Sequence, residues 1–259
     1  MRVTILGSGT SILHKERYSA GILIETGKES FLLDCGGEVI RRLLDINFDW
    51  TKIDRIFISH PHSDHIGDLL PLIQSLYVAG LYFPELKRKK TLFLHGYKDF
   101  ATDFKKLKNI MLPGVAIDFP IEIFEHRDSE VDFKTFSLKT RVVPHVPEYF
   151  NSIGFTFTIG GKKLMYSGDS SYSENLVDLA KNSDLAILEA AVPPERFRRF
   201  GPEKTHLSAC EAGIIAGKAA TKKLILTHIY DLDIDEVTNE ARKNFKGEVV
   251  LGKDLLRAF

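Results

Sequence analysis

The chain has 259 residues, of which 44% are hydrophobic, and this length and composition suit one large domain or two tightly packed halves. Its 35 basic residues equal its 35 acidic ones. This balance argues against a surface covered with phosphate-binding charge, although it leaves room for a local basic patch.

The sequence also indicates a compartment. It contains no apolar run of about eighteen residues, so we expect neither a transmembrane helix nor a membrane partner. The strand-like start from Met1 to Gly7 lacks the order of a secretory signal peptide. Two cysteines, Cys35 and Cys210, are too few for a disulfide framework. These features together predict a cytoplasmic protein.

Short apolar runs alternate with helical patterns along the whole chain. We expect strands at 3–6, 21–24, 31–33, 56–58, 91–94, 121–124, 131–138, 140–143, 153–159, 163–166, 185–188, 223–226 and 249–251. We expect helices at 38–46, 66–78, 98–106, 173–180, 208–220 and 235–245. Ser208 followed by Glu211 predicts a capping box at one helix start. The alternation predicts a layered α/β fold, but the pattern alone leaves the strand order open.

The most informative segment is the hexapeptide from His60 to His65, which contains three histidines and Asp64. It follows an apolar strand pattern and precedes a helical one, so these side chains lie where a strand passes into a helix. His60 and His62 point the same way in an extended segment and can bind one ion, while Asp64 and His65 can face a second. Imidazole and carboxylate are ligands that Zn²⁺, Fe²⁺ and Mn²⁺ accept.

Other polar residues end apolar segments farther along the chain. They are Asp34 in Leu32-Leu33-Asp34-Cys35-Gly36, His145 after Pro144, Asp169 in Ser167-Gly168-Asp169 and His228 in Leu226-Thr227-His228. Taken singly, each has an ordinary alternative as a turn residue, a helix cap or the end of a strand. His14, His95 and His126 belong to no such motif, and we expect them to be structural.

In this order, the five segments resemble the motifs of the metallo-β-lactamase-fold hydrolases. The resemblance implies a four-layer αββα sandwich, an α/β fold in which two β-sheets pack face to face with helices outside. It implies a single domain over residues 1–259, built from two structural halves with a boundary near 140–150. The metals would lie at one edge between the sheets.

The resemblance also implies a ligand set for two divalent metal ions. His60, His62 and His145 would hold one ion, Asp64, His65 and His228 would hold the other, and Asp169 would bridge both. Asp34 would orient a ligand histidine by a hydrogen bond. A water shared by ions ~3.5–4 Å apart would become the hydroxide that attacks the substrate. Zn²⁺ is the expected metal, with Mn²⁺ or Fe²⁺ as alternatives, because the set lacks a thiolate.

Two further segments, around Glu189 and His206, resemble ribonuclease Z. They imply that Glu189 holds the His206 ring charged, so that the ring binds the scissile phosphate and protonates the leaving oxygen. Alternatively, Glu189 caps a strand and His206 opens a helix independently. With Asp64, these two are the expected catalytic residues. Ribonuclease Z also carries a long basic arm that grips tRNA, but here His145 and Asp169 are only 24 positions apart. No arm fits there.

These features predict a dinuclear metal-dependent hydrolase, a ribonuclease Z-like phosphodiesterase acting on RNA ends or on small or cyclic nucleotide diesters. The same fold could instead hydrolyse a thioester, lactone or β-lactam, although such a reaction needs no Glu–His acid. A non-catalytic metal-binding protein is the third alternative. The resemblance leaves a homodimer open.

Two basic stretches are candidates for substrate binding. Between Glu189 and His206, the stretch 196–204 interleaves Arg196, Arg198 and Arg199 with aromatic residues. This composition predicts a loop over the site, with arginines for phosphate and phenylalanines for base stacking. A solvated loop whose phenylalanines pack on the core is the alternative. We expect the other stretch, 87–90, to be a solvated turn.

Overall fold

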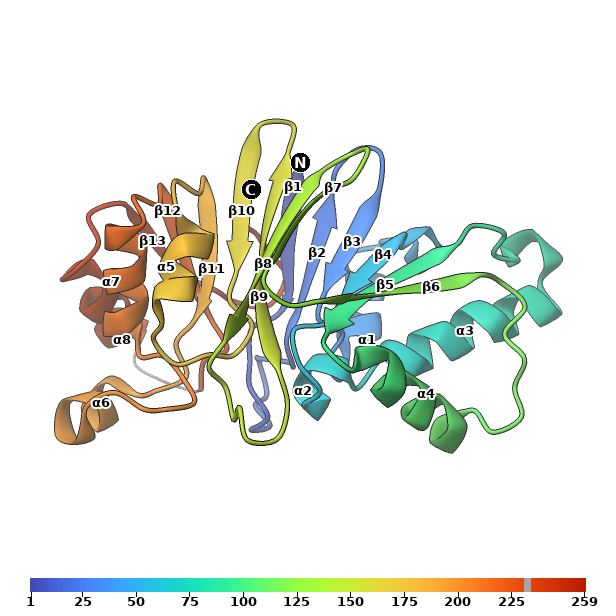
Figure 1. Ribbon diagram of the computed structural model, residues 1–259, viewed down its shortest axis with the longest axis horizontal. Coiled ribbons are helices and arrows are strands. Elements are labelled where there is room, and N and C mark those ends of the chain that lie inside the picture. The colour runs from blue at the N-terminus through green and yellow to red at the C-terminus, as the bar shows by residue number, and fades with distance from the viewer. Residues whose placement is uncertain (231–233) are drawn as a thin grey trace.

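The computed structural model describes residues 1–230 and 234–259 and contains two β-sheets packed face to face (Figure 1). In the described residues, the first sheet has the strand order β14-β1-β2-β3-β4-β5-β6 and the second has the order β13-β12-β11-β10-β9-β8-β7. The chain passes between the sheets at residues 127–128, whereas the expected boundary lay near 140–150. The last strand, β14, returns to the first sheet and pairs antiparallel with β1.

The first sheet is built mainly from the first half of the chain. Its strands are β1 (Arg2–Gly7), β2 (Gly21–Glu25), β3 (Ser30–Leu33), β4 (Arg55–Phe57), β5 (Leu92–Tyr97), β6 (Ile121–His126) and β14 (Leu256–Arg257). The helices of this half are α1 (Val39–Asp45), α2 (Ser63–Ile66), α3 (Leu69–Tyr82) and α4 (Phe100–Met111), with 3-10 turns η1 (Trp50–Lys52) and η2 (Pro84–Leu86). β3 to β6 run parallel. β4 is buried throughout, as expected of a parallel strand covered on both faces.

The second sheet changes from antiparallel to parallel pairing at β10. Its strands are β7 (Ser129–Asp132), β8 (Ser137–Val143), β9 (Ser152–Ile159), β10 (Lys162–Tyr166), β11 (Leu185–Glu189), β12 (Lys223–Thr227) and β13 (Glu248–Leu251). The helices are α5 (Glu174–Ala180), α6 (Pro194–Phe200), α7 (Ala209–Lys218) and α8 (Ile234–Arg242). The predicted capping box is confirmed, because Ser208 and Glu211 bond reciprocally at the start of α7. Among the described helices, none has the length and apolar character to cross a bilayer.

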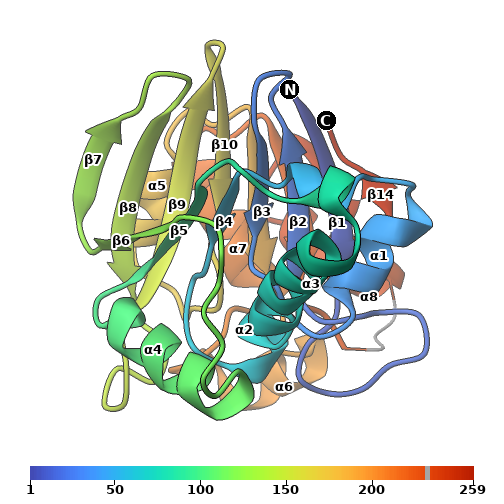
Figure 2. The same cartoon turned by 90° about the vertical axis from the view of Figure 1, so that its right-hand side faces the viewer.

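Helices lie on the outer side of each sheet, which gives the molecule four layers (Figures 1 and 2). Between the sheets, the buried ring of Phe57 lies 4.9 Å from Phe157 and 5.9 Å from Phe155, centroid to centroid, in edge-on contacts. On the outer side of the second sheet, a separate apolar cluster joins α5, α7 and α8 to the strands. The expected αββα sandwich is confirmed.

Two expected elements differ from those observed, for local reasons. The strand expected at 131–138 is interrupted, because residues 133–136 form a tight turn between β7 and β8, closed by the hydrogen bond from Phe133 N to Phe136 O at 2.8 Å. The turn lets the rings of Phe133 and Phe136 stack with centroids 4.7 Å apart. The helix expected at 66–78 is divided into α2 and α3 at Asp68, whose carboxylate accepts the amide of Ile40 and whose own amide donates to Cys35 O.

The parallel strands of both sheets bring their carboxyl ends to one edge of the sandwich. There, Ile153 N donates to Ser59 O beyond β4, and Tyr166 at the end of β10 donates to Asp34 beyond β3. Side chains that follow strands in an α/β sheet meet at this edge, where ligands commonly bind. The fold therefore gathers the polar residues that end the strands, although they are distant in sequence.

Candidate metal centre

Seven histidine and aspartate side chains from both halves converge at this edge. His60 follows β4, His62 precedes α2, Asp64 and His65 lie in α2, His145 follows β8, Asp169 follows β10 and His228 follows β12. All except His62 are buried. The fold thus brings together every residue that the sequence suggested as a metal ligand, in two clusters that share Asp169.

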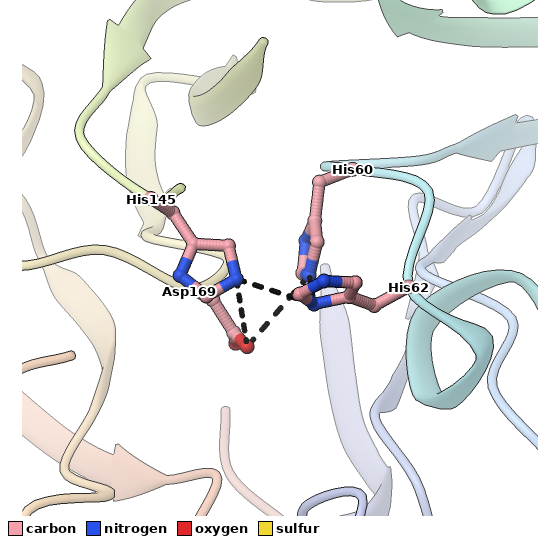
Figure 3. Close-up of side chains that lie close together, drawn as sticks. All are labelled: His60, His62, His145 and Asp169. Carbon is pink, nitrogen blue, oxygen red and sulfur yellow. Dashed lines mark hydrogen bonds and ion pairs between the residues drawn. The ribbon is translucent and has the colours of Figure 1, made fainter. Parts of the chain in front are cut away.

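One cluster contains His60, His62, His145 and Asp169 (Figure 3). Nδ1 of His62 lies 3.1 Å from Nε2 of His60 and 3.2 Å from Nε2 of His145. Oδ2 of Asp169 lies 3.7 Å from Nε2 of His60 and 3.9 Å from Nε2 of His145. Atoms that each lie ~2.1 Å from one Zn²⁺ are about 3.0–3.4 Å apart. The two distances from His62 fall within this range and the two from Asp169 exceed it, so His62 is spaced to share an ion with His60 and with His145, while Asp169 lies slightly farther away.

The second cluster contains Asp64, His65, His228 and again Asp169. Nε2 of His65 lies 3.2 Å from Oδ1 of Asp169 and 3.4 Å from Nε2 of His228. Nε2 of His228 lies 3.3 Å from Oδ2 of Asp64. Oδ2 of Asp169 also lies 3.4 Å from Nε2 of His228, so the carboxylate faces both clusters, as a bridging carboxylate would.

The chemistry of the donor set fits divalent cations. Oδ1 of Asp169 is buried and has no hydrogen-bond partner among the described residues, an arrangement that is costly unless a cation compensates it. Burial lowers the pKa of His60 well below its ordinary range and lowers that of His145 to about 4, since the interior disfavours the charged ring. Both rings are therefore neutral at pH 7, and a neutral imidazole has a lone pair to offer a metal.

Hydrogen bonds on the far side of three rings aim Nε2 of each ring at the centre. Nδ1 of His145 donates to Thr205 O at 2.8 Å, and Nδ1 of His65 donates to Oδ2 of Asp34 at 2.7 Å. Nδ1 of His60 lies 3.0 Å from the hydroxyl of Ser59. Bonds of this kind fix the tautomer and orientation of metal-binding histidines.

Asp34 is the hub of the buried network behind the second cluster. Its carboxylate accepts from the amide and hydroxyl of Ser59 at 2.7 and 2.9 Å and from the hydroxyl of Tyr166 at 2.6 Å, as well as from His65. Burial opposes a charge on His65, but Asp169 and Asp34 outweigh burial and raise the pKa of His65 well above its ordinary value. The carboxylates thus favour positive charge at this ring, which a cation at Nε2 would supply in place of the second ring proton. This geometry supports the expected role of Asp34 in orienting a histidine.

Unusual backbone conformations accompany the site. Asp34 and His228 have φ of 54° and 53°, in the left-handed region that residues other than glycine rarely adopt. Gly168, just before Asp169, has φ of 58°, and a Cβ there would lie 2.7 Å from Cβ of Ser59. Glycine therefore lets the end of β10 approach the end of β4, which brings Asp169 against His60.

Beside the clusters, Glu189 and His206 form a hydrogen-bonded pair. Nδ1 of His206 lies 3.0 Å from Oε1 of Glu189, and the same carboxylate accepts the amides of Ser170 and Ala191. Burial opposes protonation of His206, but the charge and hydrogen bond of Glu189 outweigh it and raise the pKa of His206 to about 9. The His206 ring stacks on His228 with centroids 5.6 Å apart. An imidazolium therefore lies next to the metal-binding residues.

Two adjoining hollows open at these side chains. The first, of about 300 Å³, is lined by Ser11, His62, Ser63, Asp64, Asp169, His206, His228 and Tyr230. The second, of about 390 Å³, is lined by Ile12, Ala191, Val192, Pro193, Arg196, Glu203, His206 and Tyr230. Ser11, Ile12 and Tyr230 were not among the residues predicted from the sequence. Tyr230 lies two positions after His228, which is a usable signal, but no local pattern marks Ser11 or Ile12.

The basic stretch 196–204 is not the loop that its composition suggested. Residues 194–200 form the helix α6, started by Pro193-Pro194 and ended at Gly201 with φ of 76°. Among its three arginines, Arg196 lines the second hollow. Arg198 turns to α8 and pairs with Glu236 at 2.8 Å and Glu240 at 3.2 Å, while Arg199 lies over the Phe200 ring. The helix thus directs these arginines to different surroundings.

The stretch 87–90 also differs from a simple solvated turn. Arg88 is buried and donates to the carbonyls of Ile53, Lys90 and Thr91 at 2.9 Å each. Lys87 pairs with Asp118 at 2.9 Å. Arg88 therefore links the backbone at Ile53 to the backbone at 90–91 by hydrogen bonds.

An αββα sandwich with two histidine–aspartate clusters at one edge defines a metallo-hydrolase of the metallo-β-lactamase fold. The profile of the family described as "Anti-Pycsar protein Apyc1" matches residues 1–192. The chain belongs to this family. The match ends before His206 and His228, so the last part of the site lies beyond it.

Relatives support this assignment. Ribonuclease Z of Archaeoglobus fulgidus is 29% identical over 290 aligned residues, covering 96% of this chain and 94% of the relative. The probable metallo-hydrolase YhfI of Bacillus subtilis is 30% identical, covering 98% and 97%. The crystal structure of YhfI superposes with a TM-score of 0.85 at 26% identity, covering 99% of this chain and 98% of YhfI. Human tRNase Z, short form, has a TM-score of 0.79 at 21% identity, covering 100% and 99%. That likeness is one of fold.

Proposed function

We propose that the protein is a phosphodiesterase that cleaves small or cyclic nucleotide diesters, or the ends of RNA, with two divalent ions, of which Zn²⁺ fits best. His60, His62 and His145 would hold one ion, Asp64, His65 and His228 would hold the other, and Asp169 would be shared between them. Histidine nitrogen and carboxylate oxygen in these numbers match the preferences of Zn²⁺. When bound, the ions supply a nucleophile from water at neutral pH and positive charge for the phosphate oxygens.

The observation that carries the proposal is the bond between His206 and Glu189. With Nδ1 engaged by the carboxylate at 3.0 Å, the other ring nitrogen, Nε2, is left to serve a substrate in either hollow. A ring whose pKa is raised to about 9 is an imidazolium at pH 7, so it binds a phosphate oxygen and donates a proton to the leaving alkoxide. An alkoxide is a poor leaving group and gains much from that proton.

Hydrolysis of a thioester, lactone or β-lactam is less consistent with this pair. A carbonyl made electrophilic by a metal needs no buried acid directed at a leaving group. A buried glutamate and an imidazolium beside two cations also carry a desolvation cost that a carbonyl hydrolase would have no reason to bear. The pair therefore favours a phosphodiester.

The size of the site favours a small substrate. The span between His145 and Asp169 contains β9 and β10, joined by the tight turn Gly160-Gly161. That span thus holds a short hairpin where a tRNA-gripping arm would be inserted. The second hollow, of about 390 Å³, is large enough for one organic group of a diester.

A substrate screen with metal analysis tests the proposal. The zinc-loaded protein would be assayed against cyclic mononucleotides, short oligoribonucleotides, precursor tRNA, and thioester, lactone and β-lactam compounds. We expect cleavage of small diesters, weak or no cleavage of precursor tRNA, and close to two ions per chain by elemental analysis. Turnover of the carbonyl compounds alone, or one ion per chain under metal-replete conditions, would contradict the proposal.

A further inference from the structure

A loop of residues 9–17, between β1 and β2, forms one wall of both hollows. Ser11 lines the hollow at the histidine–aspartate clusters, and Ile12 lines the second hollow together with Val192 and Pro193. The side chains of Ile12 and Leu13 are 60% and 98% exposed. This loop therefore presents apolar surface beside a polar site, at the place where the organic part of a substrate would lie.

One carboxylate from the far end of the chain holds the base of this loop. Oδ1 of Asp254 accepts from the amide and hydroxyl of Ser8 at 2.9 and 2.8 Å. Oδ2 of the same residue accepts the amide of Tyr18 at 2.9 Å. The residues that flank the loop on either side are thus bonded to two oxygens of a single side chain.

Further hydrogen bonds surround this anchor. Gly9 N donates to Tyr18 O at 2.8 Å, which closes the base of the loop. Arg17 donates from Nη1 to the Ser8 hydroxyl at 2.8 Å and to Gly252 O at 2.7 Å. The closed base is therefore fixed to the segment 252–254. Of the described hydrogen bonds between the loop base and this segment, only the one from Arg17 to Gly252 O would remain without the Asp254 carboxylate.

We propose that Asp254 is a positioning residue that holds the loop 9–17 in place, so that Ser11 and Ile12 wall the substrate hollow. The proposal rests on the proposed phosphodiesterase function for its substrate and not for the anchor itself. Asp254 touches neither hollow, so its influence passes through Ser8 and Tyr18 to Ile12. Loss of the Asp254 hydrogen bonds should leave the chemical step intact and weaken binding of the organic part of the substrate, because a mobile loop keeps less contact between Ile12 and the substrate.

The test compares Asp254→Ala with Ile12→Ser and with their double mutant. In Asp254→Ala we expect KM for a cyclic mononucleotide to rise about tenfold, with kcat little changed. Turnover of methyl p-nitrophenyl phosphate, which is too small to reach Ile12, should keep its kcat and KM. Ile12→Ser should show the same selective rise, and the double mutant should be no worse than the worse single mutant, since both changes remove one contact.

Trypsin gives a readout that is independent of turnover. Lys15 lies exposed in the loop, so the rate of cleavage after Lys15 should rise in Asp254→Ala and stay at the wild-type rate in Ile12→Ser. Asp254→Asn is a second variant in case Asp254→Ala fails to fold. Its amide oxygen can still accept hydrogen bonds at one end of the loop, whereas its NH₂ group cannot accept a hydrogen bond at the other end. An intermediate cleavage rate is expected for it.

Asp54→Asn is the matched control, since Oδ2 of Asp54 likewise accepts a backbone amide, that of Ser30, at 2.9 Å. The proposal would be overturned if Asp254→Ala left the rate of trypsin cleavage and the KM unchanged. It would also be overturned if this variant lost metal and lost kcat equally on the cyclic mononucleotide and on methyl p-nitrophenyl phosphate. Ser8 O accepts Ile229 N beside His228, so that second result would make Asp254 a support of the metal centre. If the wild type cleaves no phosphodiester, the proposed function fails. The rate of trypsin cleavage after Lys15 would still show whether Asp254 holds the loop 9–17 in place.

Discussion

Asp34 and His65 are joined by a 2.7 Å hydrogen bond between Oδ2 and Nδ1, and the same carboxylate receives three further hydrogen bonds from Ser59 and Tyr166. All four contacts are with donors, so the carboxylate serves purely as an acceptor. The Asp34→Asn change would place an NH₂ group against at least one donor. We expect the metal affinity to fall about 10–100-fold, as for other losses of a group that orients a ligand histidine.

Competition with a chelator, followed by elemental analysis, measures this effect. Asp184→Asn is a suitable control, because that carboxylate also accepts a backbone amide, from Lys163, at the opposite ends of the strands. Equal metal affinity in Asp34→Asn and the wild type would show that the network is not needed to hold His65.

His206→Ala should slow phosphodiester cleavage by roughly 10²–10⁴-fold, as expected for loss of a general acid. The metal content should stay unchanged, because His206 belongs to neither of the two clusters that share Asp169. The loss should be smaller for a substrate that releases p-nitrophenolate, which needs little protonation. Glu189→Gln should act in the same direction by removing the charge that keeps the ring protonated. Equal losses for good and poor leaving groups would limit His206 to phosphate binding.

Gly168→Ala should be destabilising for two separable reasons. A residue other than glycine in the left-handed region costs about 1–2 kcal/mol. The new Cβ would also lie 2.7 Å from Cβ of Ser59, which pushes Asp169 away from His60. Gly160→Ala is the matched control, because Gly160 has φ of 56° and open space around it. Chemical denaturation should show a larger loss for Gly168→Ala, and only that variant should lose metal.

Arg196→Ala and Arg198→Ala should separate substrate binding from helix packing. Arg196 lines the hollow next to His206, so its loss should raise KM about tenfold for a nucleotide and flatten the salt dependence of binding. Arg198 pairs with α8 at the surface, so its loss should leave KM unchanged and have little effect on stability. The reverse pattern would assign the phosphate contact to Arg198.

The buried histidines His95 and His126 should make the folded state sensitive to acid. Arg55 can only donate to Nε2 of His95, so Nδ1 of His95 carries the proton and donates to Nε2 of His126 at 3.0 Å. Burial lowers the pKa of His95 to about 2 and that of His126 to about 4, below the unfolded value near 6.5. Because the unfolded chain binds more protons below pH 6.5, stability is present above this pH and falls as the pH drops toward 4.

For His126, the loss between pH 7 and pH 5 is roughly 2 kcal/mol. His126→Gln should retain an acceptor for His95 and lose less stability over the same interval. Urea denaturation at pH 7 and pH 5 measures the loss of stability in the wild type and in His126→Gln. Both proteins are treated with a chelator first, so that release of metal contributes to neither result. The same loss of stability in the wild type and in His126→Gln would mean that His126 does not remain neutral in the folded state.

The sequence alone was enough to predict which side chains converge at the site, because the His60–His65 pattern is local and the resemblance implied the other members of the set. It also determined the layered α/β class and the pairing of Glu189 with His206 through resemblance. Local patterns are sufficient where a residue's role follows from its own segment, as with the capping box of Ser208 and Glu211.

The tertiary structure decided what depends on contacts between distant segments. It turned 194–200 into a helix and directed Arg198 to α8, since ion pairs with Glu236 and Glu240 cannot be read from the arginine stretch itself. It also placed Ser11 and Ile12 beside the site, and it joined Ser8 to Asp254, residues from opposite ends of the chain. Such contacts leave no periodic signal, because their energy comes from groups that meet only after both sheets have packed.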